Sequence, residues 1–177
     1  YLTGNPQITF FKVVYRRHTN FSMEAIEQTI SGSSGAVGAG STTSGTVTIS
    51  RNGDLVYKIY VTSETASITD GSKLINDVEL EIGGQRIDRH YQEWMDIWNE
   101  LTTPESKAIG LKAMQGSIGT SGGGSANTGV KNVVQVPLQF WFCRNPGLAL
   151  PLIALQYHEV KLKFTWGTGW AASGGPS

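Results

Sequence analysis

Apolar and polar residues alternate over several short stretches of this chain, which is the pattern of β-strands that bury one face. The alternation is regular in residues 157–166, "YHEVKLKFTW", and in 78–82, "VELEI", which lies within the longer run 73–88. Two further runs, 8–15 and 134–143, combine alternation with many β-branched and aromatic residues. These stretches predict strands. We expect Gly83 and Gly84 to bend the chain within 73–88.

Two more strands are predicted on either side of the Asn52-Gly53 pair. Residues 46–50 and 55–61 alternate, and an Asn-Gly pair readily supplies the positive φ angles of a tight hairpin. We therefore predict a hairpin with its turn at 51–54. Residues 21–30 form another expected strand, in which the apolar residues change once from one face of the strand to the other, as at a β-bulge.

One segment changes from a period of two to a helical period. In "YQEWMDIWNELT" the apolar residues recur every three or four positions, at Tyr91, Trp94, Trp98 and Leu101. This spacing predicts an amphipathic helix over 91–101 whose apolar face packs on the sandwich or on a partner. A second short helix is predicted to follow, with Thr103 as its N-cap, Pro104 in its first turn and Gly116 past its end.

These elements indicate the fold class. The strands are separated by turns and by Gly/Ser-rich stretches at 31–45 and 116–129, without regular βαβ units. We predict an all-β antiparallel sandwich of the Greek-key or jelly-roll type, with two short helices inserted once. The length of 177 residues fits one domain with a sizeable core.

Charge and composition exclude several functions. Fourteen basic and 14 acidic residues give no net charge, which argues against a protein that wraps nucleic acid. No run approaches the about 20 apolar residues of a membrane-spanning helix. The single cysteine rules out an intrachain disulfide framework and a Cys-rich zinc site, and His18, His90 and His158 form no ligand pair.

Two residue pairs could carry chemistry. Cys143 and His158 are the candidates for a Cys–His nucleophilic site, but each shares its expected strand face with apolar residues, so we interpret both as packed side chains. Glu79 and Glu81 share one strand face and could be compared with a glycosidase pair, but they fit the solvent-facing side of a strand better. We therefore predict no catalytic, cofactor-binding or metal site.

Three long stretches resemble one family. They are "YLTGNPQITFFKVVYRRHTNFSMEAIEQT", "VELEIGGQRIDRHYQEWMDIWNELT" and "PLQFWFCRNPGLALPLIALQYHEVKL". In order and in turn residues, such as Gly4-Asn5-Pro6 and Asn145-Pro146-Gly147, they closely resemble the major capsid proteins of large icosahedral double-stranded DNA viruses of eukaryotes. That group includes phycodnaviruses, iridoviruses and giant viruses.

The resemblance implies a structural protein without enzymatic activity or cofactor. It implies a double jelly-roll subunit that forms a homotrimer, the pseudo-hexagonal capsomer of an icosahedral capsid over an internal lipid membrane. The implied partners are neighbouring capsomers and minor capsid proteins, with no direct contact to nucleic acid. The implied location is the virion, with assembly in the host cell, in the cytoplasm. Residues 1–177 then correspond to the N-terminal jelly-roll domain, without its last strands and without the second jelly roll. "LQFWFC" and "LQYHEVKLKFTW" would be two of its strands.

Two other functions share the architecture. A carbohydrate-binding, lectin-like jelly roll also uses exposed tryptophans. A cupin-type metalloenzyme needs a close histidine cluster on facing strands, which three isolated histidines do not supply.

Overall fold

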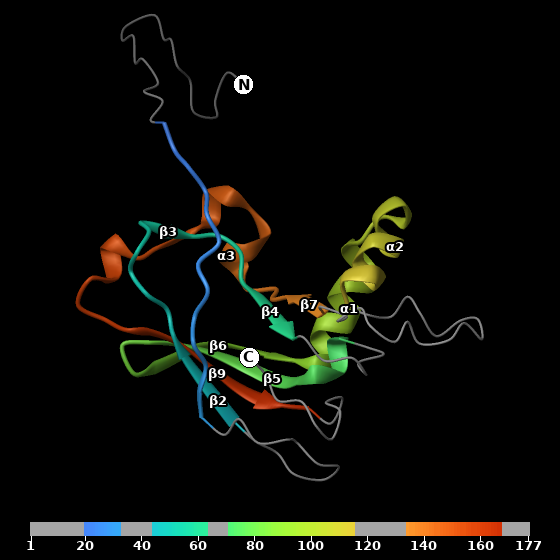
Figure 1. The fold of residues 1–177 in the computed structure, drawn as a ribbon, viewed down its shortest axis with the longest axis horizontal. Helices are drawn as coiled ribbons and strands as arrows, with labels where there is room; N and C mark the ends of the chain where they lie inside the picture. The colour runs from blue at the N-terminus through green and yellow to red at the C-terminus, as the bar shows by residue number, and fades with distance from the viewer. Residues whose placement is uncertain (1–19, 33–43, 64–70, 116–133, 168–177) are drawn as a thin grey trace, which may run out of the picture.

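The chain folds as two layers of antiparallel strands with helices at one end (Figure 1). The structure is a computed structural model that describes residues 20–32, 44–63, 71–115 and 134–167. The predicted strand at 8–15 lies outside these residues. The predicted antiparallel fold class is confirmed by the strand pairings, because every paired strand in the described residues is antiparallel to its neighbour.

The larger layer is a five-stranded sheet in the order β1-β2-β9-β5-β6. Its strands are β1 (Ser31–Gly32), β2 (Ser44–Thr48), β9 (Val160–Trp166), β5 (Ile75–Ile82) and β6 (Gln85–Tyr91). The alternation that predicted β5 and β9 is confirmed in the burial of their side chains, because Val78, Leu80, Leu162 and Phe164 all face the core. The short 3-10 helix η1 (Gly71–Leu74) leads into β5.

The turn between β5 and β6 depends on two glycines. Gly83 and Gly84 have φ angles of 60° and 84°, the left-handed region that a two-residue hairpin turn requires. A Cβ atom on Gly83 would also lie 2.7 Å from the Nδ1 atom of His158. The predicted bend is therefore a tight hairpin turn, and β6 returns along β5 to form the edge of the sheet.

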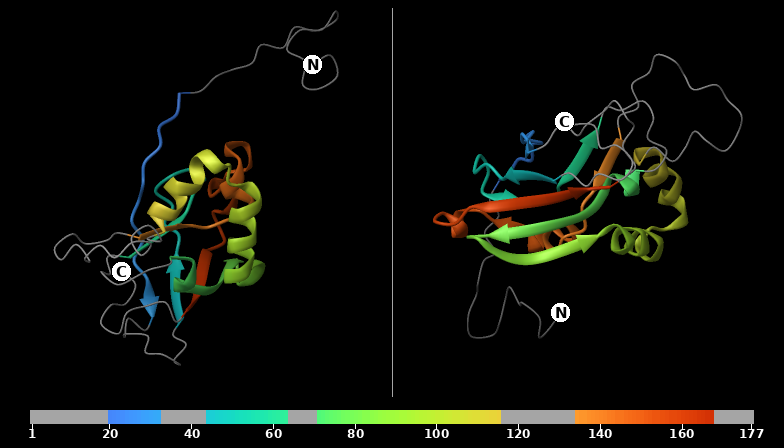
Figure 2. Two further views of the ribbon diagram at one scale, coloured as in Figure 1. Left: turned by 90° about the vertical axis from the view of Figure 1, so that its right-hand side faces the viewer. Right: turned by 90° about the horizontal axis from the view of Figure 1, so that it is seen from below.

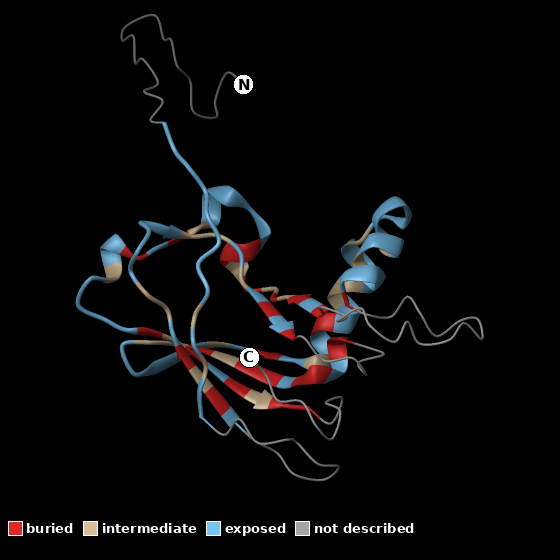
Figure 3. Ribbon diagram, viewed as in Figure 1, coloured by how far each residue is buried: buried red, intermediate tan, exposed pale blue. Residues whose placement is uncertain are grey.

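The second layer consists of two short strand pairs. β3 (Leu55–Val56) pairs with β8 (Leu150–Pro151), and β4 (Tyr60–Ser63) pairs with β7 (Val134–Pro137). These pairs lie across from the larger sheet (Figure 1). Buried residues occur in both layers (Figure 3) and belong to one core cluster.

The predicted hairpin of 46–50 with 55–61 is wrong. β2 pairs with β9, and the chain then crosses to the second layer. The Arg51 guanidinium donates hydrogen bonds to the carbonyls of Leu155 (3.1 Å) and His158 (2.6 Å), which holds residue 51 against the chain that precedes β9. Gly53 does not take the positive φ that a tight Asn-Gly turn needs. The contacts of Arg51 with distant parts of the chain therefore outweigh the local preference of Asn52-Gly53 for a hairpin turn.

Two further strand predictions need correction. Residues 20–30 form no strand, and Phe21, expected on a strand face, is 85% exposed. The strand predicted over 134–143 ends at Pro137, and residues Trp141–Arg144 form the short helix α3. A helical turn lets the consecutive residues Phe142 and Cys143 both face the core, which a strand cannot do.

The chain between α3 and β9 makes two more turns. Asn145-Pro146-Gly147, named as turn residues in the sequence, do form a turn, because the 3-10 helix η2 (Pro146–Leu148) begins there and the Asn145 side chain accepts a hydrogen bond from the Gly147 N–H (2.9 Å). A third 3-10 helix, η3 (Ile153–Leu155), precedes β9.

Both predicted helices are present at the end of the sandwich (Figure 2). They are α1 (Gln92–Thr102) and α2 (Glu105–Met114). Thr103 ends α1, and Pro104 rather than Thr103 occupies the N-cap of α2; Gly116 lies outside the described residues.

The predicted buried face of α1 is rotated. Met95 joins the core, whereas Trp94 is 39% exposed and Leu101 is 78% exposed. α1 follows β6 without a linker, so the direction of the strand fixes which side of the helix meets the sandwich. Trp94 and Leu101, which the periodicity assigned to the core, therefore lie on the outer surface, whereas Trp98 is part-buried.

Candidate assembly surface

Cys143 and His158 do not form a catalytic pair. Cys143 is buried in α3 beside a small cavity lined by Ile59, Pro137 and Leu138, and His158 is not among the cavity's lining residues. His158 is exposed, contrary to the prediction that it packs on a strand face, because β9 begins only at Val160. Burial raises the pKa of the Cys143 thiol, which disfavours the thiolate that nucleophilic chemistry requires.

Replacing Cys143 therefore tests a structural role. We expect Cys143→Ala to lower the free energy of unfolding by about 1–2 kcal/mol, as for other small buried side chains, and to leave assembly intact. Urea unfolding and the mass of the assembled protein would measure both effects. If the wild-type protein hydrolysed a substrate and the Cys143→Ala variant did not, the structural role would be contradicted.

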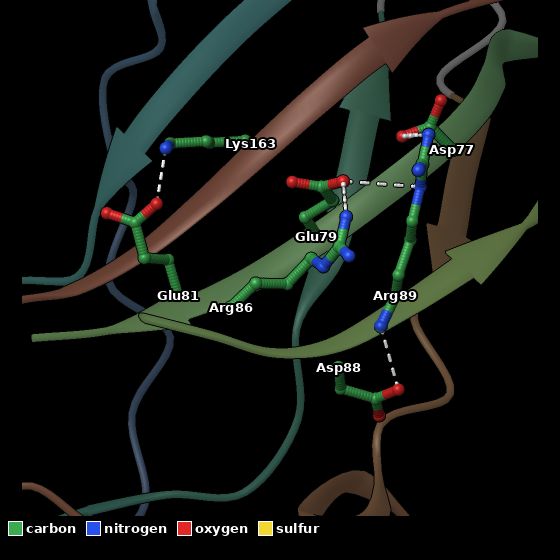
Figure 4. A network of polar contacts seen from close by, with 7 residues as sticks. All are labelled: Asp77, Glu79, Glu81, Arg86, Asp88, Arg89 and Lys163. Carbon is green, nitrogen blue, oxygen red and sulfur yellow. Dashed lines mark hydrogen bonds and ion pairs between the residues drawn. The ribbon is translucent and has the colours of Figure 1, made fainter. Parts of the chain in front are cut away.

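Glu79 and Glu81 lie on the outward face of the larger sheet and are paired with cations (Figure 4). Glu79 contacts the guanidinium groups of Arg86 (3.2 Å) and Arg89 (3.3 Å), and Glu81 pairs with Lys163. Arg89 also pairs with the buried Asp77 at 3.3 Å, and this hydrogen bond raises the pKa of Arg89. The glutamates are partners in a salt-bridge network on the solvent side of the sheet.

The charged side chains of this network are paired with one another and so offer no net charge to a ligand. It lines a shallow hollow on the sheet, where Asp77 and Glu79 face Arg89 and Lys163. Because opposite charges already neutralise one another within the sheet, the hollow has no charge excess with which to hold an ion. Most of these pairs are partly exposed, so each contributes little to stability.

His90 is a buried polar residue that the sequence reasoning did not single out. Its side chain stacks on the Phe140 ring at 4.3 Å, and the residue is only 4% exposed. Within the described residues its Nε2 atom has no hydrogen-bond partner, and the Asp88 carboxylate lies 4.0 Å from its Nδ1 atom. Burial lowers the pKa of His90, and the nearby Arg144 guanidinium acts in the same direction.

The lowered pKa predicts acid sensitivity. A histidine whose pKa is lower in the folded than in the unfolded state binds a proton more readily when the chain is unfolded. The free energy of unfolding is therefore highest above the ordinary pKa of 6.5 and falls as the pH drops below that value. We expect His90→Phe, which can keep the stacking on Phe140, to remove most of the loss in melting temperature between pH 7.5 and 5.5.

The matched control for this prediction is His158→Gln. His158 is exposed, so this variant removes a histidine without removing a side chain from the core. An equal loss of stability in acid for the wild type and the His90→Phe variant would contradict the assignment to His90.

Five large apolar side chains of α1 and α2, at the helical end, are exposed. We call this set the helix face, and it consists of Trp94, Ile97, Leu101, Ile109 and Met114. The ring of Trp98 lies inward of this face and is covered by the Arg144 guanidinium, 4.0 Å from the ring centroid. Contiguous exposed apolar residues mark contact surfaces rather than catalytic sites.

The described residues contain no other candidate for chemistry. Among them no group of three or more His, Cys, Asp or Glu side chains could hold a metal ion. None of the described helices has the length and apolar character to cross a bilayer.

Comparison with known proteins identifies the family. The family described as major capsid protein N-terminus matches residues 9–169. The major capsid protein of Pyramimonas orientalis virus is 54% identical over 179 residues, covering 94% of this chain and 43% of that protein. The major capsid protein of Paramecium bursaria Chlorella virus 1 is 49% identical, over 93% of this chain and 37% of that protein.

A solved structure agrees with these relatives. A chain in a quasi-atomic model of the PBCV-1 virus capsid matches with a TM-score of 0.66 and 43% identity, over 90% of this chain and 38% of that chain. The protein therefore has a jelly-roll fold and belongs to the major capsid protein family of large DNA viruses, which the sequence resemblance predicted. The chain spans less than half the length of these relatives.

Proposed function

We propose that this chain is the N-terminal part of a structural capsid subunit that trimerises into pseudo-hexagonal capsomers of an icosahedral shell. The observation that carries the proposal is the family match over residues 9–169. A similar chain is part of the PBCV-1 capsid, and a shell requires each copy to contact others. The exposed helix face and the absence of a nucleophile–base pair among the described residues support a structural rather than an enzymatic role.

The two layers differ in their number of paired strands, which supports the assignment of this chain to the first of two jelly rolls. In the part of the chain that the structure describes, the larger sheet has five strands and the second layer is two separate pairs. Residues 20–30 are extended and have no strand partner among the described residues. Unpaired extended backbone is covered by another strand in a closed sandwich. We propose that the last strands of this jelly roll and a second jelly roll follow in the full-length protein. The length of the relatives supports this, because the chain matches 43% and 37% of two of them.

The proposed partners follow from that role. They are two further copies in the trimer, neighbouring capsomers and minor capsid proteins, with the shell close to an internal membrane in the virion and assembled in the cytoplasm of the host cell. The balanced charge of 14 acidic and 14 basic residues supports the absence of direct nucleic-acid contact. No cofactor is proposed.

The mass of the full-length protein tests the proposal. Size-exclusion chromatography with light scattering should give a stable trimer that does not bind sugar resin. A monomer whose elution is retarded on sugar resin would instead support the lectin-like alternative, for which the exposed Trp94 is the relevant feature.

A further inference from the structure

The inner face of β6 is polar where the neighbouring strand β5 is apolar. Val78 and Leu80 of β5 are fully buried, and their partners across the strand pair are His90 and Asp88. Residues directly opposite each other in a strand pair share a face of the sheet, so His90 and Asp88 also lie on the core side. Figure 4 shows the Asp88 carboxylate on the opposite side of β6 from Glu79. Two ionisable side chains therefore lie on the inner side of the edge strand.

The surroundings of His90 suit a neutral ring. The residue is buried, its ring stacks on Phe140, and its Nε2 atom has no hydrogen-bond partner within the described residues. The Asp88 carboxylate is 4.0 Å from Nδ1, too far for a hydrogen bond, and accepts one from the Arg89 backbone N–H instead (2.8 Å). A buried imidazolium needs an acceptor for each of its two N–H groups, and this site gives Nε2 none.

Two charged side chains act on His90 in opposite directions. The Asp88 carboxylate favours the protonated ring, and the Arg144 guanidinium of α3 disfavours it. The backbone at Arg89 and Gln139 also favours the protonated ring, but burial has the largest effect and lowers the pKa of His90. The Arg89 side chain belongs to the salt-bridge network on the outward face of the sheet. Protonation of His90 would therefore add a buried positive charge near that of Arg144.

His90 lies where three segments of the chain meet. Its ring contacts Phe140, the residue directly before α3, so the stacking joins α3 to β6. Arg144, the last residue of α3, covers the ring of Trp98 in α1. Helix α1 in turn begins at Gln92, two residues after His90. A change at His90 therefore acts on β6, on α1 and on residues 139–144 together.

We propose that His90 is an acid-operated switch, whose protonation separates residues 139–144 from β6 and α1 while the centre of the larger sheet stays closed. The opening is local because the buried side chains of β9 carry no ionisable group, so acid leaves the packing of that strand unchanged. Opening lets water reach His90, which removes the cost of burying its charge. The switch is built into a single copy of the chain and does not depend on the proposed trimer.

Amide hydrogen exchange of the full-length protein at pH 7.5 and pH 5.5 tests the switch. Each exchange rate is divided by the rate expected for the unfolded peptide at the same pH, which leaves the equilibrium constant of local opening. At pH 5.5, one unit below the ordinary pKa of 6.5, protonation of the opened form should raise this constant by up to about tenfold. We expect the increase in peptides that cover 91–102 and 139–148, and none in peptides that cover 160–166.

Two variants assign the effect to His90. His90→Phe should abolish the increase in acid, whereas His158→Gln, which keeps His90, should show the same increase as the wild type. An increase that persists in His90→Phe would overturn the proposal. If that variant fails to fold, the wild-type peptides still decide, because an equal increase in 139–148 and 160–166, or no increase in either, would contradict a local switch at His90.

Discussion

Phe140→Ala should lower the free energy of unfolding by about 3–5 kcal/mol, the usual loss for a large aromatic side chain removed from a core. Phe140 is fully buried, where it stacks on His90 at 4.3 Å and on Phe142 at 5.6 Å. It joins the segment before α3 to the edge strand β6, so the truncation leaves a cavity between the two layers. Urea unfolding of the full-length protein would measure the loss.

Phe21→Ala is the matched control for this prediction. Phe21 is the same residue type but largely exposed in this chain, so its removal should change stability by less than about 0.5 kcal/mol. Similar losses for the two variants would mean that residue 21 is covered to the same extent as Phe140 in the full-length protein. A negligible loss for Phe140→Ala would contradict the packing of the core described above.

A protein ending at Ser177 should aggregate or remain partly unfolded, whereas the full-length protein should form soluble trimers. Within the described residues, 20–30 are extended without a strand partner and the second layer consists of two short strand pairs, so among these residues unpaired N–H and C=O groups lie along open edges. Open edges of this kind pair with other chains. Light scattering and thermal melting of both proteins would measure the difference.

The opposite result for the shorter protein would be informative. A monomeric 1–177 fragment that melts cooperatively would show that the sandwich closes without further strands. The proposal that the remaining strands follow Ser177 would then be wrong. The family assignment would stand, because it rests on the match over residues 9–169.

Strands with one buried face could be predicted from the sequence. One side of β5 and β9 faces the core, and the other side carries the charges of the salt-bridge network. Apolar and charged residues therefore alternate along both strands. The two helices were equally clear from the change in period and from Pro104. The resemblance of three long stretches gave the family.

Strand pairing and side-chain orientation could not be predicted in the same way. Asn52-Gly53 favours a hairpin locally, but Arg51 binds carbonyl groups more than 100 residues away along the chain, and no local pattern contains that contact. The rotation of α1 depends on how it leaves β6. Its apolar residues point both inward, at Met95, and outward, at Trp94, so periodicity alone could not identify the core side.

The candidate site was predicted only in part. Cys143 and His158 were interpreted as packed side chains, and the structure buries Cys143 but exposes His158. The apolar face of α1 was expected to pack on the sandwich or on a partner, but Trp94 is 39% exposed. The salt bridges of Arg89 depend on the register of β5 with β6, which the residue pattern does not fix. The burial of His90 depends on Phe140, a residue 50 positions away.

We propose that this chain is one jelly roll of a capsid subunit that acts as a trimer, and electron cryomicroscopy of the purified full-length protein would test this. We expect a three-fold particle with a pseudo-hexagonal outline, in which each copy contributes two jelly rolls and the described residues 71–115 and 134–167 form part of the first. A particle without three-fold symmetry, or a subunit with a single sandwich, would contradict it.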